Sequence, residues 1–89
     1  MSQTLHERAE RARKAQSLLD NPLLDEAFRL VRESCIEQMI DGKTVEERED
    51  AHRSLKMLDH VKNALHKFVR DGVKANHKLK ELEQRGDAA

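Results

Sequence analysis

The stretch from Thr44 to Gly72 carries the longest unbroken helical pattern in the chain, and it limits the folds that the chain can adopt. Its apolar residues recur at steps of three and four, the spacing of one face of an α-helix. Thr44 and Glu47 fit a capping box, in which the Thr44 hydroxyl accepts from the Glu47 amide and the Glu47 carboxylate accepts from the Thr44 amide. Gly72 predicts the end of this helix, because glycine can adopt the left-handed conformation of a helix terminus. Such a helix spans about 42 Å, so the fold must be built along it.

A second helix is predicted over residues 22–41. Asn21 is a favourable N-cap and Pro22 suits the first helical position. Its apolar positions cover about half of the circumference, which indicates contact with more than one neighbour. The connection at residues 41–43 is short and polar, and such loops join antiparallel helices. Residues 22–72 are therefore predicted to form a long antiparallel helical hairpin, in which Pro22 falls opposite Asn63.

The apolar stripe of this hairpin is too wide for two helices to cover. We therefore expect a homo-oligomer, most simply a dimer in which two hairpins form a four-helix bundle. Antiparallel packing of two chains would also bring acidic segments against basic ones. The residues expected in the core or at the oligomer interface are Leu24, Phe28, Val31, Leu55, Leu58, Val61, Leu65, Phe68 and Val69.

Two further helices are predicted to flank the hairpin. Residues 4–20 begin with a second capping-box match at Thr4 and are rich in alanine, so we expect them to make contact mainly through Leu18 and Leu19, next to Phe68 and Val69. Residues 74–85 have enough apolar spacing for a short C-terminal helix. The chain of 89 residues is thus expected to be a single all-α domain, residues 1–89.

The composition agrees with a helical protein. The formal net charge is zero, but acidic and basic residues are concentrated in different segments. Charged residues make up 38% of the chain and aromatic residues only 2%, which suits helices better than a sheet. Residues 20–50 hold ten acids against four Lys or Arg, whereas residues 51–80 hold eight Lys or Arg against two acids. One cysteine favours a reducing compartment, and no stretch suits a membrane span or a signal peptide. A cytoplasmic location without membrane contact is expected.

The outer face of the long helix carries a basic ribbon that could contact nucleic acid. Lysine and arginine along one helix face could follow the phosphates of duplex DNA, releasing counterions at each contact. The alternative is a solvated face that balances the acidic segment, and charged runs usually have this role. The ribbon consists of Arg53, Lys56, His60, Asn63, Lys67, Arg70 and Lys74.

Catalytic and metal sites are not indicated by the sequence. Glu49 and His52 have the Glu-x-x-His spacing of carboxylate-bridged metal bundles, but such sites need two of these motifs and two more glutamates. Cys35 lies on the apolar arc and is expected to pack as a small hydrophobic residue. We therefore expect no enzymatic activity, no metal and no cofactor.

Three motifs together resemble a known group of proteins. They are Asn-Pro-Leu-Leu at residues 21–24 followed by Ala-Phe at 27–28, Glu-Glu-Arg-Glu at 46–49 leading into Leu-Lys-Met-Leu at 55–58, and Asp-Gly-Val-Lys-Ala at 71–75. Over about residues 18–75 the chain resembles a loose group of short helical proteins encoded by tailed bacteriophages and prophages near packaging and head genes. The resemblance implies a phage origin, the bacterial cytoplasm as location, and a role in assembly or DNA packaging.

Two classes of function follow from these observations. In the first, the protein is a non-enzymatic interaction protein that acts in assembly or modulates a partner protein. In the second, it is a small duplex-DNA-binding accessory or regulator that uses the basic ribbon, although no helix-turn-helix signature supports this class.

Overall fold

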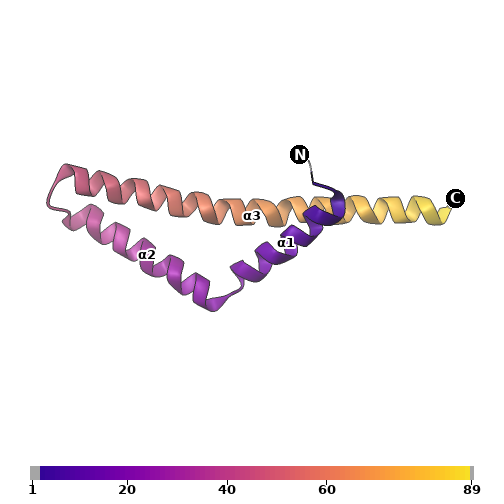
Figure 1. Ribbon diagram of the computed structural model, residues 1–89, viewed down its shortest axis with the longest axis horizontal. Helices are drawn as coiled ribbons and strands as arrows, with labels where there is room; N and C mark the ends of the chain where they lie inside the picture. Colours follow the sequence, from indigo (N-terminus) through magenta and orange to yellow (C-terminus); the bar gives the residue numbers. More distant parts are fainter. Residues whose placement is uncertain (1–2, 89) are drawn as a thin grey trace. The chain divides into compact units, whose positions relative to one another are not determined.

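The computed structural model describes residues 3–88, which form three helices and no strand (Figure 1). The helices are α1 (Leu5–Leu19), α2 (Pro22–Asp41) and α3 (Val45–Ala88). The predicted all-α fold is confirmed. The chain divides into two compact units, one of residues 20–63 and the other of α1 together with α3 from Ala64 onward. The expectation of a single domain stays a prediction.

The unit of residues 20–63 is an antiparallel hairpin of α2 and the first part of α3. The Asn21 side chain caps α2, because its oxygen accepts hydrogen bonds from the amides of Leu23 at 2.9 Å and Leu24 at 3.3 Å. Pro22 occupies the first turn, where it removes no helical hydrogen bond. The predicted start of this helix is therefore confirmed together with its cause.

The turn between α2 and α3 is held by hydrogen bonds from both helices. Thr44 accepts from the Glu47 amide at 3.1 Å, as predicted, but the Glu47 carboxylate accepts from the Lys43 amide at 2.8 Å instead of that of Thr44. The Gly42 amide donates to the Gln38 carbonyl, and Arg48 donates to the Gly42 carbonyl. A Cβ at Gly42 would lie only 2.6 Å from that Gln38 oxygen, so this position needs glycine for close approach and not for a left-handed backbone.

The interior of the hairpin is narrow and contains small side chains. Cys35 on α2 and Ala51 on α3 are the buried residues of this unit. Arg32 and Asp59 join the two helices in an ion pair at 3.0 Å, and the Lys62 ammonium lies 5.7 Å from the ring centre of Phe28. Cys35 is thus buried as expected, but the core around it is thin.

The structure corrects the prediction that the long helix ends at Gly72. Helix α3 continues without interruption to Ala88, so the expected separate helix over residues 74–85 is its continuation. Gly72 has no positive φ angle. An interior glycine costs a helix about 1 kcal/mol, which the helix-favouring residues on both sides can offset. Glycine is used here because α1 packs directly against it.

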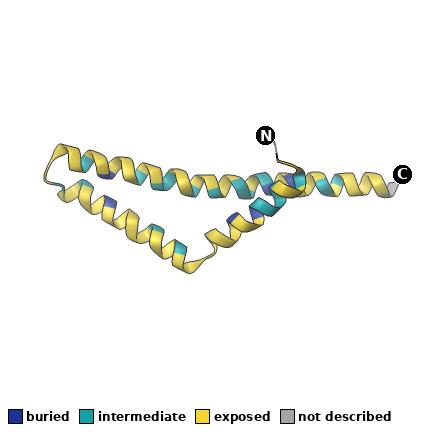
Figure 2. Ribbon diagram, in the orientation of Figure 1, coloured by how far each residue is buried: buried dark blue, intermediate teal, exposed yellow. Residues whose placement is uncertain are grey.

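In the second unit, α1 packs on α3 through small side chains. Ala12 and Ala15 are the buried residues of α1, and Gly72 and Ala75 are buried on α3 (Figure 2). The expected contact through Leu18 is wrong, since Leu18 is 47% exposed and Leu19 is only half-buried. Small residues let the two backbones approach closely, and this approach is what holds α1.

Candidate interaction surfaces

The basic ribbon lies entirely on α3, and all seven of its side chains are exposed. Because α3 does not break at Gly72, Lys74 continues the same helix as Arg53. Arg53 pairs with Asp50 one turn away. Among the described residues, no ion pair is found for Lys56, Lys67 or Lys74.

The two acids within the basic segment of α3 are paired with arginines of other helices. In the hairpin, Asp59 pairs with Arg32 of α2, and in the second unit Asp71 lies 3.5 Å from Arg11 of α1. Asp59 and Asp71 are therefore partly neutralised by arginines that do not belong to the ribbon. The lysines of the ribbon are exposed to solvent.

The predicted apolar stripe is only partly covered. Val31 and Val61 are 48% and 46% exposed. The other predicted stripe residues are half-buried, and they are Leu24, Phe28, Leu55, Leu58, Leu65, Phe68 and Val69.

Large apolar side chains outside that stripe are exposed to a degree that the sequence did not reveal. Leu23 is 72% exposed, Ile40 is 73% exposed and Met57 is 63% exposed. By contrast, the buried side chains among the described residues are alanines and Cys35, and no large side chain is fully buried. Many large apolar side chains of the three helices therefore remain in contact with water.

Arg11 forms a contact that sequence reasoning missed. Its guanidinium carbon lies 4.2 Å above the ring centre of Phe68, and its terminal nitrogen lies 3.5 Å from Asp71. Its Nε is buried without a hydrogen-bond partner. The arginine stem covers the aromatic ring while the charged end reaches a carboxylate. No signal in the sequence pointed to this contact, because it depends on the packing of Ala12 against Gly72.

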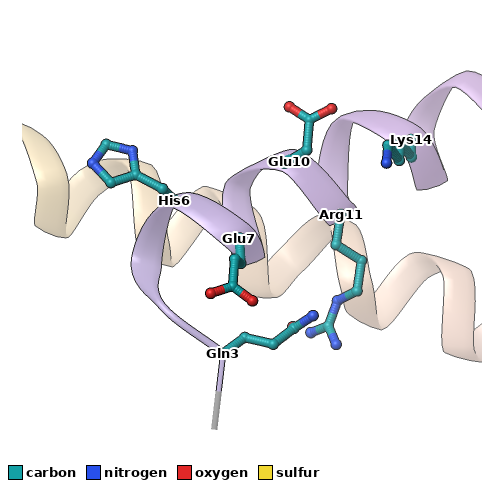
Figure 3. A pocket seen from close by; sticks show the side chains of 6 residues that line it. All are labelled: Gln3, His6, Glu7, Glu10, Arg11 and Lys14. Atoms are coloured by element: carbon teal, nitrogen blue, oxygen red, sulfur yellow. The ribbon is translucent and has the colours of Figure 1, made fainter.

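A shallow depression of about 650 Å³ lies along the first turns of α1 (Figure 3). Glu7 and Arg11 extend from one side of the helix towards Gln3, whereas Glu10 extends from the other side. The polar groups that line it do not converge on one point. This depression therefore offers no arrangement of acid, base and nucleophile that would act on a single substrate atom.

Within residues 3–88, no group of three or more His, Cys, Asp or Glu side chains is placed to hold a metal ion. Glu49 and His52 are both exposed, and Cys35 faces the hairpin interior. The single Glu-x-x-His motif is therefore not completed by ligands from another helix.

No known protein family, curated protein or solved structure gives a significant match to this chain. In the described part of the chain, no helix has the length and apolar character needed to cross a membrane. Two surfaces stand out, the exposed apolar side chains of the hairpin and the basic ribbon of α3.

Proposed function

We propose that this protein is a non-enzymatic interaction protein that binds other helices, including those of its own kind, through the exposed apolar side chains of its hairpin. One observation carries the proposal. Leu23, Leu30, Val31, Met57 and Val61 are all between 46% and 72% exposed, whereas the buried residues of the same hairpin are Cys35 and Ala51. Large apolar side chains clustered on a surface are typical of an interaction site.

The energetics favour association over an isolated hairpin. Fully burying a large apolar side chain contributes about 1.5–3 kcal/mol, so burying the exposed half of each contributes about 1 kcal/mol. Several such side chains on one hairpin, repeated on a partner helix, supply a driving force comparable with the marginal stability of a small domain. An amphipathic partner helix would fit between two helices in the way helix-in-groove complexes do.

The resemblance to phage-encoded proteins suggests a setting for this activity. A helical protein with a thin core and an exposed apolar surface suits an adaptor or modulator. A role in phage assembly or DNA packaging stays a prediction that follows from the motifs at residues 21–24, 46–49 and 71–75.

Quantitative partner capture from the native source tests the proposal. The full chain, the variant pair Leu30→Gln with Met57→Gln, and the ribbon pair Lys56→Ala with Lys67→Ala serve as baits. We expect a partner protein that is recovered with the wild type and the ribbon variant and is lost with the apolar variant. Equal recovery with all three baits would contradict the proposal, because the apolar surface would then have no part in binding.

A second candidate function, binding of duplex DNA, is supported by the exposure of the whole basic ribbon and by its lysines, for which no ion pair is found among the described residues. Four phosphate contacts, through Arg53, Lys56, Lys67 and Arg70, would give a log–log salt slope of about −3.6. Each alanine substitution should reduce that slope by about one unit. Lys14→Ala is the matched control, because it removes the same charge from the exposed surface of α1.

A gel-shift titration at about 50 mM salt with random-sequence duplex decides this question, since non-specific binding is strongest at low salt. Binding with the expected slope, weakened by the ribbon substitutions and not by Lys14→Ala, would establish DNA as a ligand. The absence of a shift at tens of micromolar protein would remove this candidate, because non-specific DNA-binding proteins usually engage at that concentration or below.

A further inference from the structure

Three large apolar side chains are exposed at the end of the hairpin where the turn joins α2 to α3. Ile40 is 73% exposed, Val45 is 59% exposed and Ile36 is 40% exposed. All three belong to the compact unit of residues 20–63. The proposed function makes no use of them.

These three side chains lie on one side of the hairpin. Ile36 and Ile40 lie about 100° and 140° around the axis of α2 from the buried Cys35, at 3.6 residues per turn. Val45 lies about 120° around the axis of α3 from the buried Ala51, in the same rotational sense. In an antiparallel pair of helices, offsets of the same sense place side chains on the same side.

The ion pair between Arg32 and Asp59 supports this geometry. Both residues are offset from the same buried residues by about 60–80° in the same sense. Their side chains meet at 3.0 Å across the two helices, as matching offsets require. Leu30 and Met57 are offset by about 120–140° in the opposite sense, so they lie on the other side of the hairpin. We name the tip patch for its three members, Ile36, Ile40 and Val45.

The segment that carries the tip patch is acidic. Residues 33–53 hold seven acids against three Lys or Arg. Two of these bases are engaged within the hairpin, since Arg48 donates to the Gly42 carbonyl at 2.8 Å and Arg53 pairs with Asp50. The tip therefore presents a negative potential to a partner.

Two exposed carboxylates border the tip patch. Glu37 lies one turn from Ile40 on α2, and Glu49 lies one turn from Val45 on α3, which is the spacing of neighbours on a helix surface. Among the described residues, no ion pair is found for either carboxylate. Both are therefore open to a cation from outside the hairpin.

Helix stability does not explain the acids at the end of α2. Glu37 lies near the C-terminal end of this helix, Asp41 is its last residue, and α2 has no basic residue in its last turn. The C-terminal end of a helix carries partial negative charge, so carboxylates are unfavourable there, whereas they are favourable in the first turns of α3. A cationic ligand would offset this repulsion.

We infer that the tip patch binds a helix of another protein that has apolar residues along one face and lysine or arginine at the edges of that face. The apolar face covers Ile36, Ile40 and Val45, and the basic edges lie beside Glu37 and Glu49. The negative charge of the tip disfavours other occupants. It repels the phosphates of DNA and anionic lipids, and it repels the same patch of a second copy.

Fluorescence anisotropy with a cationic amphipathic helix tests the inference on the full chain. The probe is a labelled synthetic peptide of leucine and lysine, with leucine on one face and about 18 residues, long enough to form a helix. Ile40→Gln should raise the Kd of this probe about tenfold, because it removes the most exposed apolar side chain of the patch. Leu30→Gln is the matched control, since Leu30 is 53% exposed on the other side of α2. It should change the Kd by less than about twofold.

Neutralising one carboxylate tests the charge of the partner. Glu37→Gln should raise the Kd of the probe about threefold at about 50 mM salt, and by less at high salt, because salt screens exposed charges. Glu26→Gln is the matched control, since Glu26 is an exposed carboxylate of α2 more than two turns from the patch. A peptide with glutamate in place of lysine should bind at least about tenfold more weakly than the probe.

Three results of these titrations would overturn the inference. They are the absence of probe binding at about 100 μM protein, equal effects of Ile40→Gln and Leu30→Gln, and equal binding of the cationic and anionic peptides. Sedimentation equilibrium of the chain alone tests the remaining occupant. Self-association that is lost in Ile40→Gln would assign the patch to a second copy and would also overturn the inference.

The inference goes beyond the proposed function, which depends on side chains such as Leu30 and Met57 on the other side of the hairpin, and the two can fail separately. Probe binding at the tip patch, with equal partner recovery by all three baits, would overturn the proposed function alone. Partner capture that is lost with the apolar variant, together with a probe that does not bind, would overturn the inference alone.

Discussion

The contact between Gly72 and α1 leads to a prediction that opposes the usual effect of removing a glycine from a helix. A Cβ at Gly72 would overlap the Cβ of Ala12 and would lie 3.4 Å from both the Ala12 Cα and the Arg8 carbonyl oxygen. None of these atoms belongs to a flexible side-chain end that could turn away. In the variant Gly72→Ala, the two helices must therefore move apart.

Two effects of opposite sign decide the outcome of this substitution. Alanine in place of an interior glycine favours the helix by about 1 kcal/mol. Forcing a methyl group into a filled contact costs about 1–3 kcal/mol. Taking about 2 kcal/mol for the steric cost, Gly72→Ala should destabilise the protein by about 1 kcal/mol, which corresponds to a fall in Tm of roughly 4–8 °C for a chain of this size.

Thermal unfolding followed by far-UV circular dichroism measures this effect. Protein concentration must be held fixed, because association shifts Tm by mass action. Gly86→Ala is the matched control, since a Cβ there meets nothing within 4 Å and only the gain in helix propensity remains. The fifteen residues of α1 form a helix of marginal stability when undocked, so Gly72→Ala should also lower the helical signal.

A compensating substitution separates the steric effect from other causes. Ala12→Gly removes the methyl group that a new Cβ at position 72 would meet. The exchange of the two residues, Ala12→Gly with Gly72→Ala, should therefore recover most of the lost stability. The reasoning is wrong if Gly72→Ala is as stable as Gly86→Ala and keeps the full helical signal.

Three further predictions concern the hairpin. Asn21→Ala should destabilise it by about 1 kcal/mol, measured by urea unfolding, because two amides of α2 lose their acceptor; an unchanged midpoint would show that water replaces the cap. The Cys35 thiol should react with an aromatic disulfide reagent only as fast as the hairpin opens, since it is buried, and a rate equal to that of the unfolded chain would contradict this. A double-mutant cycle on Arg32 and Asp59 should give a coupling below about 1 kcal/mol that falls with salt, because both side chains are about half exposed; a larger, salt-independent value would contradict that assignment.

The sequence by itself determined that the chain is helical and where α2 and α3 begin. Asn21 and Thr44 were predicted as helix starts because a capping side chain bonds to amides only two or three residues away. The hairpin followed from the three-residue connection and from the matching periodicity on both sides of it. The register that places Pro22 opposite about Asn63 stays a prediction.

Only the tertiary structure decided the role of Gly72 and the exposure of the apolar stripe. A glycine after a helical stretch can end a helix or admit a neighbour, and local sequence does not distinguish these outcomes. In this protein Gly72 admits a neighbouring helix, because the methyl group of Ala12, more than fifty residues away, occupies the space that a side chain at position 72 would need. In the same way, periodicity placed Val31 and Val61 on an apolar arc, but their exposure depends on where the other helix lies across it. Contacts between residues distant in sequence follow from packing geometry. The pattern of apolar residues along the sequence limits the possible packing arrangements but does not select one of them.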